Sequence, residues 1–232
     1  MPTLTVEKHA VPSIPPLPAV SPAEAALRRR LLAVLLEPAQ PGRMTYEEFL
    51  AWADEDTLAE WVDGEIIMTS PASLRHQSTS GFLFQLLSIF VETRRLGVVI
   101  TAPFQMKLAH SGREPDLLFV AGDHLHRLRP TYLDGPADLA VEIVSPESVG
   151  RDRGEKFTEY EAGGILEYWL IDPQRRWVEF YHLEGEHYQL AFAGAEGHYR
   201  STVLPGFWLR VEWLWQQPLP PVLDVLRELG LI

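Results

Sequence analysis

The chain has 232 residues, of which 46% are hydrophobic and 22% charged, so it can bury a substantial core and has the composition of a globular protein. It contains no cysteine, no apolar segment long enough to span a membrane and no secretory signal pattern, so disulfides and thiolate chemistry are excluded and a cytoplasmic protein is expected. The net charge of −12 argues against a surface that attracts nucleic acid broadly, and a nucleic-acid enzyme of this charge would need local basic groups.

The N-terminal segment differs in composition from the rest. Residues 1–22 contain six prolines and no periodic apolar pattern, which predicts an extended leader. Residues 23–37 carry leucines at helical spacing, and Pro38 ends that pattern. This helix either docks on its own domain or forms a subunit contact, and the sequence leaves both readings open.

The remaining sequence predicts an alternation of helices and strands. Thr45 and Glu48 form a capping-box pattern at the start of a short helix, and Asp63-Gly64 is a strong hairpin turn. The expected elements are, in order, a helix ending near 53, a hairpin over 59–69, a helix over 73–96 closed by Gly97, strands over 98–108 and 117–120 around a polar turn at 110–114, a polar loop over 121–136, a strand over 139–144, a helix over about 151–162, a strand over 167–171, a meander over 177–183 and 188–192, a strand over 208–211 and a helix over 222–229. This order predicts an α+β fold with one mixed central β-sheet flanked by helices, followed by a C-terminal β-meander.

Glu142 is the strongest functional signal. Within the apolar strand 139–144, alternation places Ala140, Glu142 and Val144 on one face of the sheet. An ionised carboxylate in such surroundings is costly unless a cation or a hydrogen-bond donor meets it. The structural alternative is a glutamate on an edge strand that faces water or pairs with one arginine.

Asp116 and Lys156 gain interest from their positions. Asp116 opens a strand that could lie beside the strand of Glu142, although Pro-Asp is also common in turns. Lys156 is one of three lysines in the chain and lies in the helix after that strand, where it could fold back toward the strand end. Tyr160 shares its helix face and could position water or phosphate, but core packing is the ordinary role of such a tyrosine.

Two further candidates frame the entry to the long helix. Glu65 follows the hairpin turn and could add a third acid, and His76 could carry a proton because imidazole titrates near neutrality. A lone histidine is more often structural. His124 and His126 resemble a chelating pair, but in a polar loop the pattern is weak.

Two carboxylates and one ammonium on adjoining elements could hold a hard divalent cation beside a polarising amine. This is the chemistry of metal-assisted phosphodiester cleavage.

These residues lie within motifs that resemble a known family. The motifs are Asp63-Gly64-Glu65, His76-Gln77, Glu114-Pro115-Asp116 and the segments 138–146, 156–160 and 167–173. Together they resemble the Uma-two family of restriction-endonuclease-like proteins, within the PD-(D/E)XK nuclease superfamily, over about residues 45–211. The resemblance implies a nuclease-like domain over 44–213, preceded by a leader and accessory helix over 1–43 and followed by a C-terminal helix over 214–232 that packs on the domain.

The resemblance also implies roles for individual residues. Asp116 and Glu142 would be the metal-binding acids, the backbone carbonyl of Ile143 a further oxygen ligand, and Lys156 the active-site lysine. The superfamily's usual acid-x-lysine triplet is absent, because Val144 occupies the lysine position. The amine has moved to the following helix at Lys156, as in this family.

We therefore expect a Mg²⁺- or Mn²⁺-dependent endonuclease that hydrolyses phosphodiester bonds in DNA, with a homodimer suited to cutting two strands. Two alternatives remain open: a noncatalytic nucleic-acid-binding or interaction module on the same scaffold, and a metal-dependent enzyme acting on a small phosphorylated molecule.

Overall fold

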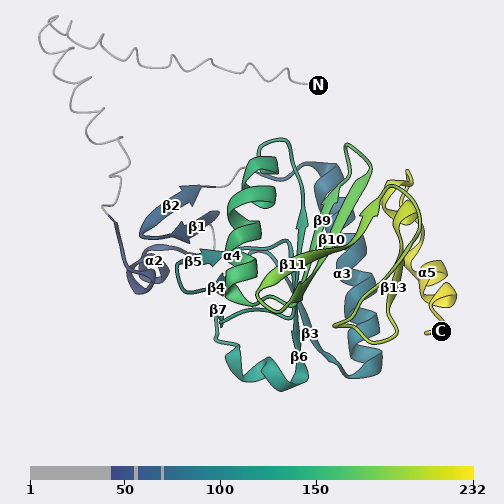
Figure 1. The fold of residues 1–232 in the computed structure, drawn as a ribbon, viewed down its shortest axis with the longest axis horizontal. Coiled ribbons are helices and arrows are strands. Elements are labelled where there is room, and N and C mark those ends of the chain that lie inside the picture. Colours follow the sequence, from purple (N-terminus) through teal and green to yellow (C-terminus); the bar gives the residue numbers. More distant parts are fainter. Residues whose placement is uncertain (1–42, 55–56, 69–70) are drawn as a thin grey trace, which may run out of the picture. The chain divides into compact units, whose positions relative to one another are not determined.

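The computed structural model describes residues 43–54, 57–68 and 71–232, which lie in one compact unit spanning Gly42–Ile232. The leader and helix expected over residues 1–37 lie outside the described residues. Figure 1 shows the unit as a sheet with helices on both sides. Within the described part, no helix is long and apolar enough to cross a membrane.

A six-stranded mixed sheet forms the centre of this unit and confirms the predicted α+β class. Its strands, in spatial order, are β11 (His187–Gly194), β10 (Trp177–Glu184), β9 (Glu167–Asp172), β8 (Leu139–Ile143), β6 (Leu117–Ala121) and β3 (Gly97–Thr101). Strands β8 and β9 pair in parallel, and the other neighbours pair antiparallel. The expected meander, β10 and β11, continues this sheet.

Helices cover both faces of the central sheet (Figure 1). The face that includes Leu139 and Val141 packs against α3 (Leu74–Arg94) and the C-terminal α5 (Val222–Glu228). The face that includes Ala140 and Val144 packs against α4 (Lys156–Gly163). The alternation read from the sequence is thus the one observed, and it directs Glu142 toward α4.

A second sheet corrects three expectations. Its strands, in spatial order, are β2 (Glu65–Met68), β1 (Ala59–Val62), β5 (Ser111–Arg113), β4 (Gln105–Lys107) and β7 (Tyr132–Asp134). The strand expected over 98–108 is broken after Thr101, and β4 joins this second sheet. The polar turn expected over 110–114 is wrong, because β5 pairs with both β1 and β4. A polar segment can form this buried strand because the Arg113 guanidinium is ion-paired to Glu60 and Glu159. The loop expected over 121–136 also contains structure, the 3-10 helix η1 (Gly122–Arg127) and β7.

The helix ends follow local rules with one exception. The capping box of α2 (Tyr46–Trp52) is present, with Glu48 and Thr45 bonding each other's backbone N–H groups. Helix α3 ends at Arg94 and is capped by Arg95 in the left-handed conformation, whereas a helix to residue 96 closed by Gly97 was expected. Gly97 instead opens β3, where a Cβ atom would lie 2.0 Å from the carbonyl oxygen of Val120. Glycine is required here by close strand approach rather than by a helix cap.

The helix expected over 151–162 has two parts. Residues Arg151–Glu155 form the π-helical turn η2, in which the Lys156 N–H bonds to the Arg151 carbonyl, and α4 follows. Such π-helical turns are rare in proteins overall, but those that occur are often found at functional sites.

The C-terminal segment is anchored to the sheet by Glu167. Strands β12 (His198–Arg200) and β13 (Trp208–Arg210), the 3-10 helix η3 (Val211–Trp215) and α5 make up this segment. The Glu167 side chain is fully buried and accepts hydrogen bonds from Trp169, Tyr199, Ser201 and the Thr202 and Val203 backbone N–H groups, at 2.6 to 3.2 Å. Neutral donors therefore satisfy this buried carboxylate.

Replacing Glu167 by alanine should lower the free energy of unfolding by at least about 3 kcal/mol, because several buried donors would lose their acceptor together. Urea denaturation followed by circular dichroism measures the change. Glu184→Ala, on an exposed position of the same sheet, is the matched control and should change stability by less than about 0.5 kcal/mol. Equal, small effects in both variants would show that Glu167 does not anchor the segment.

Candidate active site

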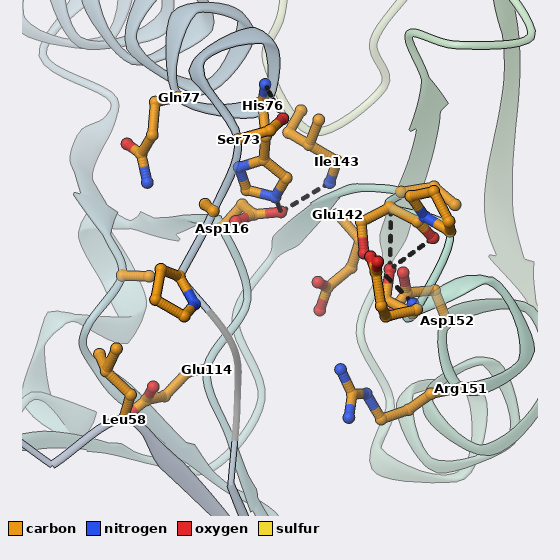
Figure 2. A pocket seen from close by; sticks show the side chains of 18 of the residues that line it. Leu58, Ser73, His76, Gln77, Glu114, Asp116, Glu142, Ile143, Arg151 and Asp152 are labelled. Carbon is orange, nitrogen blue, oxygen red and sulfur yellow. Dashed lines mark hydrogen bonds and ion pairs between the residues drawn. The ribbon is translucent and has the colours of Figure 1, made fainter.

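A cavity of about 580 Å³ lies where β8 ends, β6 begins and the N-terminal ends of α3 and η2 approach (Figure 2). It is lined by residues from both sheets, including Glu114, Asp116, Glu142, Arg151 and Lys156. The topology explains the convergence: β6 runs antiparallel to β8 with Leu117 opposite Val141, so the start of one strand lies beside the end of the other.

Asp116 is held by one of its two carboxylate oxygens. Its Oδ2 atom accepts a hydrogen bond from the Ile143 backbone N–H at 2.6 Å and lies 3.2 Å from His76 Nε2 (Figure 2). Its Oδ1 atom has no hydrogen-bond partner within the described residues. The carboxylate is therefore oriented, with one oxygen available to a ligand.

The two carboxylate oxygens of Glu142 also differ in their contacts. Its Oε1 atom accepts from Lys156 Nζ at 2.9 Å and from the Tyr160 hydroxyl at 2.8 Å. Its Oε2 atom has no hydrogen-bond partner in the part of the chain that the structure describes. Only 5% of the side chain is exposed, and the residue lines the cavity. Two acids from neighbouring strands thus each offer one uncommitted oxygen to one cavity.

Lys156 is buried among three carboxylates. Its Nζ atom lies 2.9 Å from Glu142 Oε1, 3.0 Å from Glu60 Oε1 and 3.9 Å from Asp152 Oδ1. Burial lowers the lysine pKa, but these anions outweigh it and raise the pKa above the ordinary value. The side chain is therefore an ammonium at neutral pH.

Glu60 connects this site to the second sheet. Besides Lys156, its carboxylate pairs with Arg113 at 3.0 Å and accepts from the Glu114 backbone N–H at 3.0 Å. Burial raises the pKa of Glu60, but Lys156 and Arg113 more than compensate and lower it to about 2. Arg113 in turn forms a two-point contact with Glu159 on α4, at 2.8 and 2.5 Å. The lysine is thus fixed from both sheets.

Negative charge exceeds positive charge around the cavity. Six carboxylate residues line it, against three permanent cations: Glu60, Glu114, Asp116, Glu142, Glu147 and Asp152 against Arg75, Arg151 and Lys156. Burial, reinforced by neighbouring acids, raises the pKa of Glu142 to about 8 even though Lys156 opposes it. Burial likewise raises the pKa of Glu114 to about 7 and that of Asp152 above its ordinary value. An additional cation would relieve this excess.

The donor set fits a hard divalent cation. The uncommitted oxygens of Asp116 and Glu142 are of the kind that Mg²⁺ and Mn²⁺ prefer, and Ile143 also lines the cavity. Within the described residues, no group of three or more His, Cys, Asp or Glu side chains could hold a metal. An ion here would therefore complete its shell with water and substrate oxygens, as Mg²⁺ commonly does.

The structure brings together most of the residues expected from sequence. Asp116, Glu142, Ile143, Lys156 and His76 line the cavity. Tyr160 does not line it but lies buried behind Glu142, to which its hydroxyl donates.

Glu65 is placed elsewhere. It is exposed on β2, opposite Val62 across the hairpin, and it does not line the cavity. His124 and His126 also lie outside it; the first contacts Asp138 and the second the Asp123 carbonyl.

Sequence reasoning missed Glu60 and Asp152. Asp152 could have been found, because it lies four residues before Lys156, the spacing at which helical side chains meet. Glu60 carries a weaker signal, a charged residue between apolar ones in a short strand, and its partner Arg113 is 53 residues away in the chain. Only the pairing of β1 with β5 reveals that contact.

Comparison with known proteins defines first the class of fold and then the family. The structure is similar to a crystal structure described as "a putative nuclease belonging to DUF820" from Anabaena variabilis ATCC 29413, with a TM-score of 0.65 and 17% sequence identity over 74% of this chain and 97% of that one. The chain thus has a nuclease-like fold. The family model "Uma2: Putative restriction endonuclease" matches residues 46–212, and the chain belongs to this family. No match was found among curated proteins.

The acid-rich cavity should make stability depend on pH when no divalent cation is bound. Glu142 and Glu114 have folded-state pKa values of about 8 and about 7, raised from 4.5, so the folded state binds more protons than the unfolded state between these limits. The free energy of unfolding should therefore fall as pH rises from about 4.5 to about 8. The lowered pKa of Glu60 acts only below about pH 4.5, outside this window.

Urea denaturation in the presence of EDTA, repeated across this pH range, measures the slope. Glu142→Gln removes one titrating group and should flatten the slope, whereas Glu65→Gln, an exposed acid outside the cavity, should leave it unchanged. A wild-type protein whose stability rises over this range would contradict the assignment.

Proposed function

We propose that the protein is a Mg²⁺- or Mn²⁺-dependent endonuclease that hydrolyses phosphodiester bonds in DNA. One observation carries the proposal: Asp116 and Glu142, from adjacent strands, each present an uncommitted oxygen to the cavity that Lys156 lines. Membership of a restriction-endonuclease family supports the same reaction class. The proposal includes a cytoplasmic location and a homodimer, which suits cleavage of two strands.

Asp116, Glu142 and the Ile143 carbonyl would hold the cation. When bound, the ion polarises a phosphate oxygen and lowers the pKa of a bound water. The Ile143 N–H and His76 orient Asp116, so its free oxygen points in a fixed direction before substrate arrives. Burial lowers the pKa of His76, but its bond to Asp116 outweighs this and raises it, which favours a charged, donating imidazole.

Lys156 acts as an electrostatic group. Because its pKa is raised, it stays protonated and serves as a hydrogen-bond donor rather than a general base. It would stabilise negative charge that develops on the phosphate, or orient the attacking water. Tyr160 is a positioning residue, since its hydroxyl fixes Glu142 from behind the cavity.

The negative charge of the protein and of its cavity favours a second candidate function. The net charge of −12 and the surplus of acids at the cavity suit a noncatalytic nucleic-acid-binding or interaction module that has kept the scaffold. This alternative predicts no metal-dependent cleavage of plasmid DNA.

Asp116→Asn and Glu142→Gln should each abolish binding of Mn²⁺, measured by isothermal titration calorimetry, and reduce plasmid nicking by at least about a hundredfold. Each change replaces a charged oxygen ligand by a neutral amide while keeping the side-chain shape. Glu65→Gln is the matched control and should behave as wild type.

Unchanged Mn²⁺-dependent nicking in both site variants would refute the assignment. Tight Mn²⁺ binding by wild type without any nicking would favour the noncatalytic module.

Lys156→Met should separate cation binding from cleavage. The ammonium and the ion repel each other across Glu142, so its removal should preserve or strengthen Mn²⁺ binding. Nicking should fall by about a hundredfold or more, because a donor to the developing charge is lost. Circular dichroism must first show a folded variant, since Glu60 and Glu142 lose a buried partner. Retained nicking in the folded variant would exclude the proposed role.

A further inference from the structure

Arg151 differs from the other cations at the cavity. Arg75 donates to the carbonyls of Leu214 and Gln216, and Lys156 is surrounded by three carboxylates. The Arg151 side chain has no hydrogen bond or ion pair within the described residues, and its Nε atom is buried without a partner. Of the three permanent cations that line the cavity, Arg151 is therefore the one whose side chain has no hydrogen-bond or ion-pair partner among the described residues.

The π-helical turn places this group in the cavity. The Lys156 N–H bonds to the Arg151 carbonyl, so residues five apart are brought into line along η2. In a regular α-helix, five residues turn through about 500°, which would place the two side chains roughly 140° apart. Both instead line the same cavity, and Figure 2 shows the Arg151 side chain extending into it.

Arg153, the neighbouring arginine, differs from Arg151 in having ion-pair partners. Arg153, two residues further on, is paired with Glu179 at 3.2 Å and lies 3.7 Å from Asp172, outside this cavity. A guanidinium matches the geometry of a phosphate, which it can bind through two parallel N–H groups. An unpaired guanidinium also offsets the surplus of acids that would otherwise repel a polyanion from the site.

We propose that Arg151 binds a backbone phosphate of the nucleic-acid substrate and holds the strand at the cavity. This inference rests on the proposed function, since it names the group that recognises the substrate of that site. Arg151 binds the substrate in its ground state, so it sets affinity and not the chemical step.

The test measures binding of a fluorescein-labelled DNA duplex by anisotropy, in Ca²⁺ to hold the substrate uncleaved, over a range of salt concentrations. Each phosphate contact contributes about 0.9 to the slope of log K against log salt on duplex DNA. Arg151→Gln should lower the magnitude of this slope by about 0.9 and weaken binding about tenfold at low salt. Arg151→Lys keeps the charge and should keep the slope. Arg153→Gln, the matched control, should leave the slope unchanged.

Steady-state nicking in Mn²⁺ supplies the second readout. Arg151→Gln should raise KM about tenfold and change kcat by much less. A wild-type slope and KM in Arg151→Gln would overturn this inference while leaving the proposed function intact. A fall in kcat with unchanged KM would also overturn it. Wild-type protein that neither binds nor cleaves DNA would overturn the inference and the proposed function together, and the Asp116→Asn calorimetry would then show whether the cation site survives.

Discussion

The contact on which the site depends is the buried ammonium of Lys156. It lies within 3.0 Å of carboxylates from both sheets and is itself carried by α4. A buried ion pair adds little net stability, but an uncompensated buried charge costs several kcal/mol. The three elements therefore have to assemble together, because none can be displaced without leaving a charge unpaired. The same requirement keeps one oxygen of Glu142 occupied and leaves its other oxygen to the cavity.

The strand arrangement supplies the second constraint. Strands β6 and β8 run antiparallel, so an acid just before one strand meets an acid near the end of the next. The backbone N–H of Ile143 and the His76 side chain then orient Asp116. Acids on a strand or directly beside one are positioned more accurately than acids on longer loops, which suits a site that must hold a small ion.

The local features of the site could be predicted from the sequence, but its long-range contacts could not. Glu142 could be predicted because an acid inside an apolar strand is costly, and the periodicity of that strand was correctly read. Glu65 was placed at the site because it follows a turn, but the hairpin directs it to the far strand, and Glu60 holds the position instead. The Arg113 contact joins residues 53 positions apart, which no local pattern encodes. The π-helical turn was equally hidden, since Arg151–Glu155 contains no apolar side chain whose spacing could distinguish it from an ordinary helix.

The ion pairs that link Glu60, Arg113 and Glu159 decide whether the second sheet can be removed from the domain. They join the second sheet to α4 through two buried groups, Glu60 and Arg113, and the half-buried Glu159. The small sheet is therefore an integral component and not a removable appendage. A fragment trimmed to the central sheet and its helices would retain both proposed ligands yet lose Glu60, one of the three carboxylates around its lysine. Any transplantation of this centre into another scaffold would have to include the hairpin as well.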